Sequence, residues 1–95
     1  MRTNKIAISQ YCKHYQIETN FVTVLDEMGI LDISQIENES YVEASNLRNL
    51  ERCRQLHYEL NINPEGIDVI LNLLNKQNQL QEEIQELKNR LKLHE

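Results

Sequence analysis

A few residues in this sequence have types and spacings that could bind a metal ion, but they do not complete a site. Cys53 and His57 lie four residues apart on a predicted helix, so both side chains would face the same side. Cys12 and His14 lie two residues apart, which places them on different sides of a helix. Because two ligands do not make a metal site, we expect all four residues to be structural, with no metal or cofactor bound.

The sequence also lacks the arrangements of residues that catalysis requires. It has no glycine-rich phosphate loop and no nucleophile spaced with a base, and its three histidines, His14, His57 and His94, are scattered. The carboxylates fall mostly on predicted helix surfaces, where contact with solvent does not create the perturbed environment of a catalytic carboxylate. We therefore predict a binding protein and not an enzyme.

The charge balance favours a basic or neutral protein partner. The chain has fifteen Asp and Glu residues and ten Lys and Arg residues. Most of the acidic excess lies in residues 1–45, which contain seven acidic and three basic side chains. Because affinity for nucleic acid depends on clustered Lys and Arg, nucleic acid is not the expected partner. An acidic face that only keeps the protein in solution is the alternative. The predicted partner-binding residues are Glu18, Asp26, Glu27, Glu37, Glu39 and Glu43.

Length and composition predict one small, helix-rich domain. The chain has 95 residues with two Gly and one Pro, so it has room for one core and little material for tight turns. It has no apolar run of the roughly 18 to 20 residues that cross a bilayer and no apolar signal segment. We expect a soluble cytoplasmic protein without a membrane partner.

Two short helices with a tight connection predict a helix-turn-helix near the start of the chain. Ser9 is a suitable N-cap for a helix through Tyr15. Apolar residues at helical spacing predict a second helix from about Thr19 to Met28, which Gly29 would end.

The next stretch, ILDISQIENESYV at residues 30–42, has apolar side chains on both sides of the polar turn ENES. This pattern predicts an irregular β-hairpin, which behind a helix-turn-helix is called a wing. Such a hairpin must pack on the helices to be stable, and a plain loop is the alternative.

Two further helices are predicted in the second half of the chain. Ser45 can cap a helix that extends to about Leu60, and Asn63 with Pro64 marks the start of a last helix that continues to about Leu93. At about 1.5 Å per residue this helix would be about 45 Å long, whereas a compact chain of this size is roughly 32 Å across. We therefore assign residues 1–62 to the winged domain with its arm helix and residues 63–95 to a long helix that closes the core and projects beyond it.

The last helix carries an apolar stripe with the seven-residue repeat of a coiled coil. A second copy of the chain is the simplest source of a partner helix, so we predict a homodimer. The polar Gln77 inside the stripe would fix register or orientation. A single frayed helix is the alternative. The predicted dimerisation residues are Ile70, Leu73, Gln77, Leu80, Ile84, Leu87 and Leu91.

The order of these elements resembles the layout of MerR-type winged-helix proteins over almost the whole chain. The chain more specifically resembles the CbpM family of chaperone modulators through ISQYCKHYQI, VLDEMGIL and LHYELNINPEGIDVILNLL. The resemblance implies a mainly α fold, a MerR-like winged helix-turn-helix with a short β-hairpin wing and a long C-terminal coiled-coil helix. The last and most specific segment matches through Leu56, Glu59, Leu60, Ile62, Gly66, Ile67, Leu71, Leu73 and Leu74.

The resemblance to CbpM proteins also implies a partner. These proteins bind the J-domain of the DnaJ-like co-chaperone CbpA as homodimers and inhibit it. Because J-domains present a basic helix to their Hsp70 partner, a modulator that covers this helix is expected to be acidic. The resemblance therefore implies a non-enzymatic adaptor for a J-domain co-chaperone.

A DNA-binding transcriptional regulator of the MerR family is the alternative function. Such a protein needs basic residues in the second helix and the wing. Where MerR regulators resemble TLRYYE, this chain has FVTVLD, so Thr23 stands at the arginine position and Glu27 adds an acid. Where their wing resembles GYRxY, this chain has SYVEA, so Val42 replaces the arginine and Glu43 follows. Losing several phosphate contacts predicts little DNA binding at physiological salt.

Overall fold

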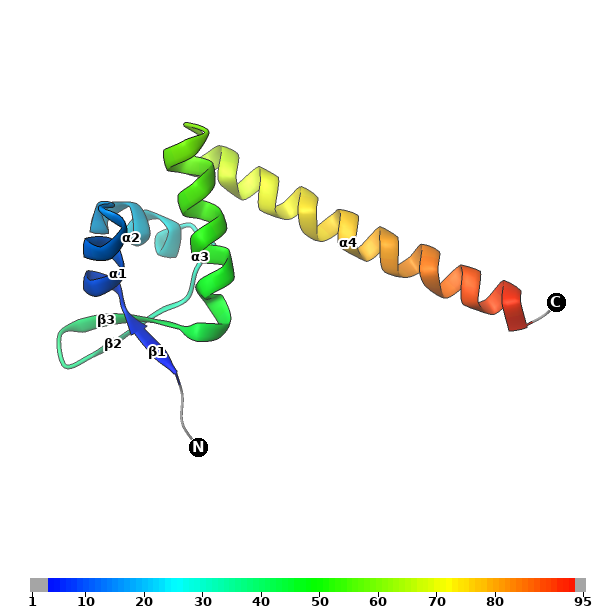
Figure 1. Ribbon diagram of the computed structural model, residues 1–95, viewed down its shortest axis with the longest axis horizontal. Coiled ribbons are helices and arrows are strands. Elements are labelled where there is room, and N and C mark those ends of the chain that lie inside the picture. Colours follow the sequence, from blue (N-terminus) through cyan, green and yellow to red (C-terminus); the bar gives the residue numbers. More distant parts are fainter. Residues whose placement is uncertain (1–3, 94–95) are drawn as a thin grey trace. The chain divides into compact units, whose positions relative to one another are not determined.

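The computed structural model describes residues 4–93, in two compact units that divide between Pro64 and Glu65. The first unit combines short helices with a small sheet, and the second is formed by one long helix (Figure 1). The prediction of a mainly helical winged fold is confirmed.

The first unit begins with the predicted helix-turn-helix. Helix α1 spans Ile8–Tyr15 and helix α2 spans Thr19–Glu27. The chain turns at Gln16, whose φ of 56° is left-handed, and the N–H of Ile17 donates to the carbonyl oxygen of Cys12 over 2.9 Å. These backbone contacts explain how two helices are joined so tightly without a glycine.

The predicted N-cap of the first helix is wrong. Helix α1 starts at Ile8, one residue before Ser9, and the N-cap position is held by Ala7 without a side-chain hydrogen bond. The reason is a short strand, β1 at Lys5–Ala7, which pairs with another strand and leads directly into the helix. Ser9 is therefore free to point its hydroxyl group elsewhere.

The wing is a three-stranded antiparallel sheet in the order β1-β3-β2. Strand β2 spans Ile33–Ile36 and strand β3 spans Glu39–Glu43, so a hairpin is confirmed, but the sheet has one more strand than predicted. In this register Val42 on the central strand pairs with Ile6 on one side and Ile33 on the other. Val42 is fully buried, which ties the sheet to the core.

The hairpin starts later in the chain than predicted, and its turn has fewer residues. Its first strand begins at Ile33 and not at Ile30, because the N–H of Ile30 closes the end of α2 by donating to the carbonyl oxygen of Leu25. The turn consists of Glu37 and Asn38 alone, with φ angles of 50° and 66°. Two consecutive positive φ angles identify a type I′ turn, whose twist matches that of the flanking strands.

The predicted third helix is divided into three helical segments. A 3-10 turn at Ala44–Asn46 precedes helix α3 at Leu47–Arg54, and a π-helical turn at Gln55–Glu59 follows it. The predicted cap at Ser45 is wrong, since Ser45 lies inside the 3-10 turn. The segment ends near the predicted residue, where the N–H of Ile62 donates to the carbonyl oxygen of Leu56.

The core of the first unit is built from the apolar faces of the helices and the central strand. Phe21, Val22 and Leu25 face inward from α2 because they recur at helical spacing. The other buried residues of this unit are Ile8, Tyr11, Cys12, Ile17, Leu31, Val42, Leu50 and Cys53.

Helix α4 spans Pro64–Leu93 and begins at the predicted proline. Proline suits the first helical position, where its missing N–H has no intrahelical acceptor, and Glu65 complements the positive end of the helix dipole. Two residues of the predicted C-terminal segment, His94 and Glu95, lie outside the described residues. Within residues 4–93, no helix is long and apolar enough to cross a membrane.

Candidate functional site

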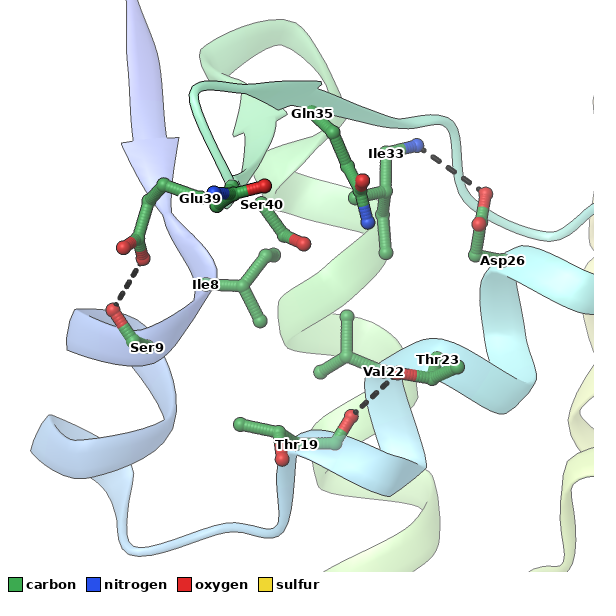
Figure 2. Close-up of a pocket in the computed structure, with 11 residues that line it drawn as sticks. Ile8, Ser9, Thr19, Val22, Thr23, Asp26, Ile33, Gln35, Glu39 and Ser40 are labelled. Carbon is green, nitrogen blue, oxygen red and sulfur yellow. Dashed lines mark hydrogen bonds between the residues drawn. The ribbon is translucent and has the colours of Figure 1, made fainter.

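A groove in the first unit lies between α1, α2 and the wing (Figure 2). It encloses about 240 Å³. Ile8 and Val22 are buried beneath it, and half-buried Ile33 of β2 contributes a third apolar side chain. The polar side chains that line it are Ser9, Thr19, Thr23, Asp26, Gln35, Asn38, Glu39 and Ser40.

The predicted residue Asp26 lies at the α2 side of this groove. Its Oδ1 accepts a hydrogen bond from the backbone N–H of Ile33 over 3.3 Å, which joins the end of α2 to the start of β2 (Figure 2). This bond holds the carboxylate in place without neutralising its charge.

The predicted residue Glu39 lies at the opposite, wing side of the groove. Its Oε1 accepts a hydrogen bond of 2.7 Å from the hydroxyl group of Ser9 on α1 (Figure 2). Neither Asp26 nor Glu39 forms an ion pair with any residue in the described range. The groove is therefore lined on its two sides by carboxylates that are oriented by uncharged donors.

The structure places the other four predicted partner-binding residues outside this groove. Glu18 stands at the N-cap of α2, where its backbone N–H donates to the Tyr58 hydroxyl group over 3.2 Å. Glu27 is the exposed last residue of α2, and Glu37 is in the exposed wing turn. Glu43 ends β3 and lines a smaller hollow of about 180 Å³.

The uncharged residues that shape the groove were not predicted from the sequence. Ser9 was expected to cap a helix, yet its hydroxyl group orients Glu39. Thr23, which stands at an arginine position of the similar DNA-binding proteins, lines the groove and donates to the carbonyl oxygen of Thr19 over 3.2 Å. Their positions depend on the pairing of β1 with β3, which brings the wing beside α1 and which no local sequence pattern reveals.

The residues considered as metal ligands have structural roles. Cys53 is fully buried, and removal from water raises the pKa of its thiol to about 11. The ring of His57 stacks on Phe21 at 4.5 Å, and its Nδ1 lies 2.8 Å from the carbonyl oxygen of Ile62, to which it donates. Residues 4–93 contain no group of three His, Cys, Asp or Glu that could hold a metal ion.

A basic side chain of α3 contacts two aromatic residues of α1. The Nε of Arg54 donates to the Tyr11 hydroxyl group over 3.1 Å, and the guanidinium group lies 4.1 Å from the centre of the Tyr15 ring. Burial raises the pKa of Tyr11, so the phenol remains a neutral acceptor for this bond. Arg54 therefore fixes α1 against α3.

The predicted dimerisation residues occupy helix α4. Five of the predicted residues are apolar side chains that are between 48% and 65% exposed, and a sixth, Ile70, is half-buried. Gln77 is also exposed. The exposed apolar residues of this stripe are Leu73, Leu80, Ile84, Leu87 and Leu91.

Comparison with protein families finds one match that spans most of the chain. The family model described as MerR HTH family regulatory protein matches residues 6–89. The match includes all of α1, α2, the hairpin and α3, together with most of α4. A search of curated proteins finds no relative that matches the chain.

Proposed function

This chain belongs to the MerR HTH family of regulatory proteins, and from that premise we propose that it is a non-enzymatic regulator that binds another protein. The partner that we propose is the J-domain of a DnaJ/CbpA-like co-chaperone, which the protein would inhibit by covering its basic helix. The resemblance to CbpM chaperone modulators supports this choice of partner.

The observation that carries the proposal is the charge of the surface formed by α2 and the wing. A MerR protein that binds DNA needs cations on these two elements. Here α2 contains no Lys or Arg, and none of the residues lining the adjacent groove is basic. The groove instead holds Asp26 and Glu39, which would repel a phosphate backbone and attract a cationic protein surface.

Two positions where similar DNA-binding proteins carry arginine support the same conclusion. Val42 in β3 is fully buried, so its position on the strand cannot offer a side chain to DNA. Thr23 in α2 is exposed, but its hydroxyl group donates within its own helix. Neither position supplies the charge that phosphate contacts require.

We also propose that the protein acts as a homodimer through the stripe on α4. A lone helix of this kind is marginal in water, and large exposed apolar side chains at coiled-coil spacing gain free energy when a second helix covers them. A second copy supplies the same stripe.

The test is a pair of titrations with the full chain. One uses a purified J-domain fragment, and the other uses a mixed-sequence DNA duplex, each between about 50 and 200 mM salt. We expect saturable binding to the J-domain and no DNA binding at the higher salt. DNA binding that falls steeply with salt, together with no J-domain binding, would instead support the transcriptional regulator.

A further inference from the structure

The groove between α1, α2 and the wing combines an apolar floor with charged sides. Ile8 and Val22 are 5% and 0% exposed, so a ligand in the groove would lie on a firmly packed base. Figure 2 shows Asp26 and Glu39 on different sides of these apolar side chains. A ligand that fits this arrangement needs an apolar section and a cationic group.

The two carboxylates retain hydrogen-bonding capacity for such a cationic group. Each uses one oxygen in the bond that orients it, Asp26 to the N–H of Ile33 and Glu39 to the hydroxyl group of Ser9. The second oxygen of each carboxylate has no hydrogen bond to a residue within 4–93. Hydrogen bonds between a carboxylate and a cation are shorter and stronger than those between neutral groups.

Lysine and arginine side chains have the two parts that the groove requires. Their methylene stems lie along apolar surface while the charged end reaches polar groups. A phosphate would be repelled by the carboxylates, and the described residues offer no set of three ligands for a metal ion. A purely apolar side chain would leave both carboxylates without a partner and partly removed from water.

We propose that this groove is an anchor site for one Lys or Arg side chain of the partner protein, whose stem lies on Ile8, Val22 and Ile33 and whose cationic group bonds to Asp26 and Glu39. This inference rests on the proposed function, because it takes a basic protein surface as the partner. It adds that one buried contact supplies much of the affinity, in the way that arginine anchors do at other interfaces.

The first test compares neutral variants that lose the same charge at different places. Asp26→Asn and Glu39→Gln keep the oxygen that accepts the internal hydrogen bond, so the groove retains its shape. Glu27→Gln and Glu43→Gln are matched controls outside the groove. We expect each groove variant to weaken J-domain binding about tenfold or more and each control by less than about threefold, since a direct hydrogen bond between a carboxylate and a cation contributes more than an exposed charge that only attracts the partner.

The second test fills the groove from within the chain. Thr23→Arg places a guanidinium group at the groove, where it can occupy the two carboxylates and exclude the partner's side chain. Asn20→Arg adds the same residue to an exposed position of α2 that does not line the groove. We expect Thr23→Arg to abolish binding and Asn20→Arg to weaken it only modestly.

The outcomes separate this inference from the proposed function. If the wild-type chain does not bind the J-domain, the proposed function fails. If it binds but all four neutral variants weaken binding equally, the acidic surface attracts the partner and the anchor site is refuted. A double-mutant cycle gives a further check, in which each Lys or Arg of the J-domain is replaced in combination with Asp26→Asn. We expect one of these basic residues to contribute to affinity in the wild-type complex but not in the complex with Asp26→Asn. Additive effects at every basic position would overturn the proposal.

Discussion

Asp26 and Glu39 are two acidic residues that line one groove, where we propose that they hold a cationic side chain. Each carboxylate is held by an uncharged donor, the N–H of Ile33 or the hydroxyl group of Ser9. Such a donor fixes the direction of the carboxylate and leaves its charge available. The other predicted acids lack this combination of orientation and shared groove, so we expect them to guide the approach of a partner without anchoring it.

The buried thiol of Cys53 predicts a specific dependence of stability on pH. Its pKa in the folded chain is about 11, above the value of 9.0 expected for an exposed thiol. The folded state therefore retains this proton at pH values where the unfolded state loses it. The contribution of this thiol to the free energy of unfolding is therefore complete below about pH 9 and is lost as the pH rises towards 11. Between pH 8 and 10.5 we expect this contribution to fall by about 2 kcal/mol.

Urea unfolding of the wild type and of Cys53→Ala at these two pH values tests this prediction. The variant is expected to be less stable at both, because the substitution leaves a small cavity. Its stability should nevertheless fall less between pH 8 and 10.5 than that of the wild type, while the other titrating groups affect both proteins alike. Equal losses in the two proteins would show that the thiol is not protected from ionisation.

Residue types and spacing predicted part of this site. They located the acidic region, but they did not show which carboxylates line the same groove. That depends on the pairing of Ile6 with Val42, which brings β3 beside the start of α1 and so places Glu39 next to Ser9. A contact between residues 30 positions apart leaves no local signal in a single sequence.

Among the elements, the wing turn has backbone geometry that its residues do not favour. Both Glu37 and Asn38 have positive φ angles, and the preferred pair for such a type I′ turn is Asn-Gly. We expect the double variant Glu37→Asn with Asn38→Gly to raise the free energy of unfolding by about 1 kcal/mol, because it removes strain at a non-glycine position.

Urea unfolding measures this gain, and J-domain binding provides the control. Because Asn38 lines the groove and Glu37 does not, the binding control is the single variant Glu37→Asn, which should bind within about threefold of the wild type. A loss of stability in the double variant would mean that the native residues stabilise the turn in another way.

The stripe on α4 predicts the result of changing three of its residues. Replacing Leu80, Ile84 and Leu87 with Gln removes the apolar surface that a second helix would cover, so we expect monomers of 11.3 kDa. Light scattering measures the mass in solution.

A matched control places the same residue type on other faces of the helix. Asn78, Glu82 and Asn89 lie off the seven-residue stripe, and their replacement with Gln should leave a dimer. An unchanged mass for the stripe variant, or a monomeric wild type, would contradict the assignment of this stripe as the dimer contact.

Helical periodicity predicted the elements of this fold better than it predicted their ends. It located α1, α2 and α4 because each carries apolar residues at regular spacing. Strand β1 has only three residues, too few for alternation to identify it. The π-helical turn at Gln55–Glu59 contains His57, whose ring stacks on Phe21 of another helix, and helical periodicity does not report such a contact between distant residues.

For the whole molecule, the family and the charge distribution have different implications. The match over residues 6–89 makes the chain a MerR-type regulatory protein, a class whose helix-turn-helix is suited to DNA. Yet α2 has no basic residue, and the groove beside it is lined by Asp26 and Glu39. This combination is what leads us to propose a basic protein surface, and not DNA, as the partner of this regulatory fold.

The most direct test of this account is the affinity of the full chain for a J-domain fragment and for duplex DNA, measured side by side at about 150 mM salt. At this ionic strength charges separated by more than about 8 Å are largely screened, so a specific contact is distinguished from general attraction. The account predicts saturable J-domain binding and no measurable DNA binding. Specific DNA binding without J-domain binding would contradict it.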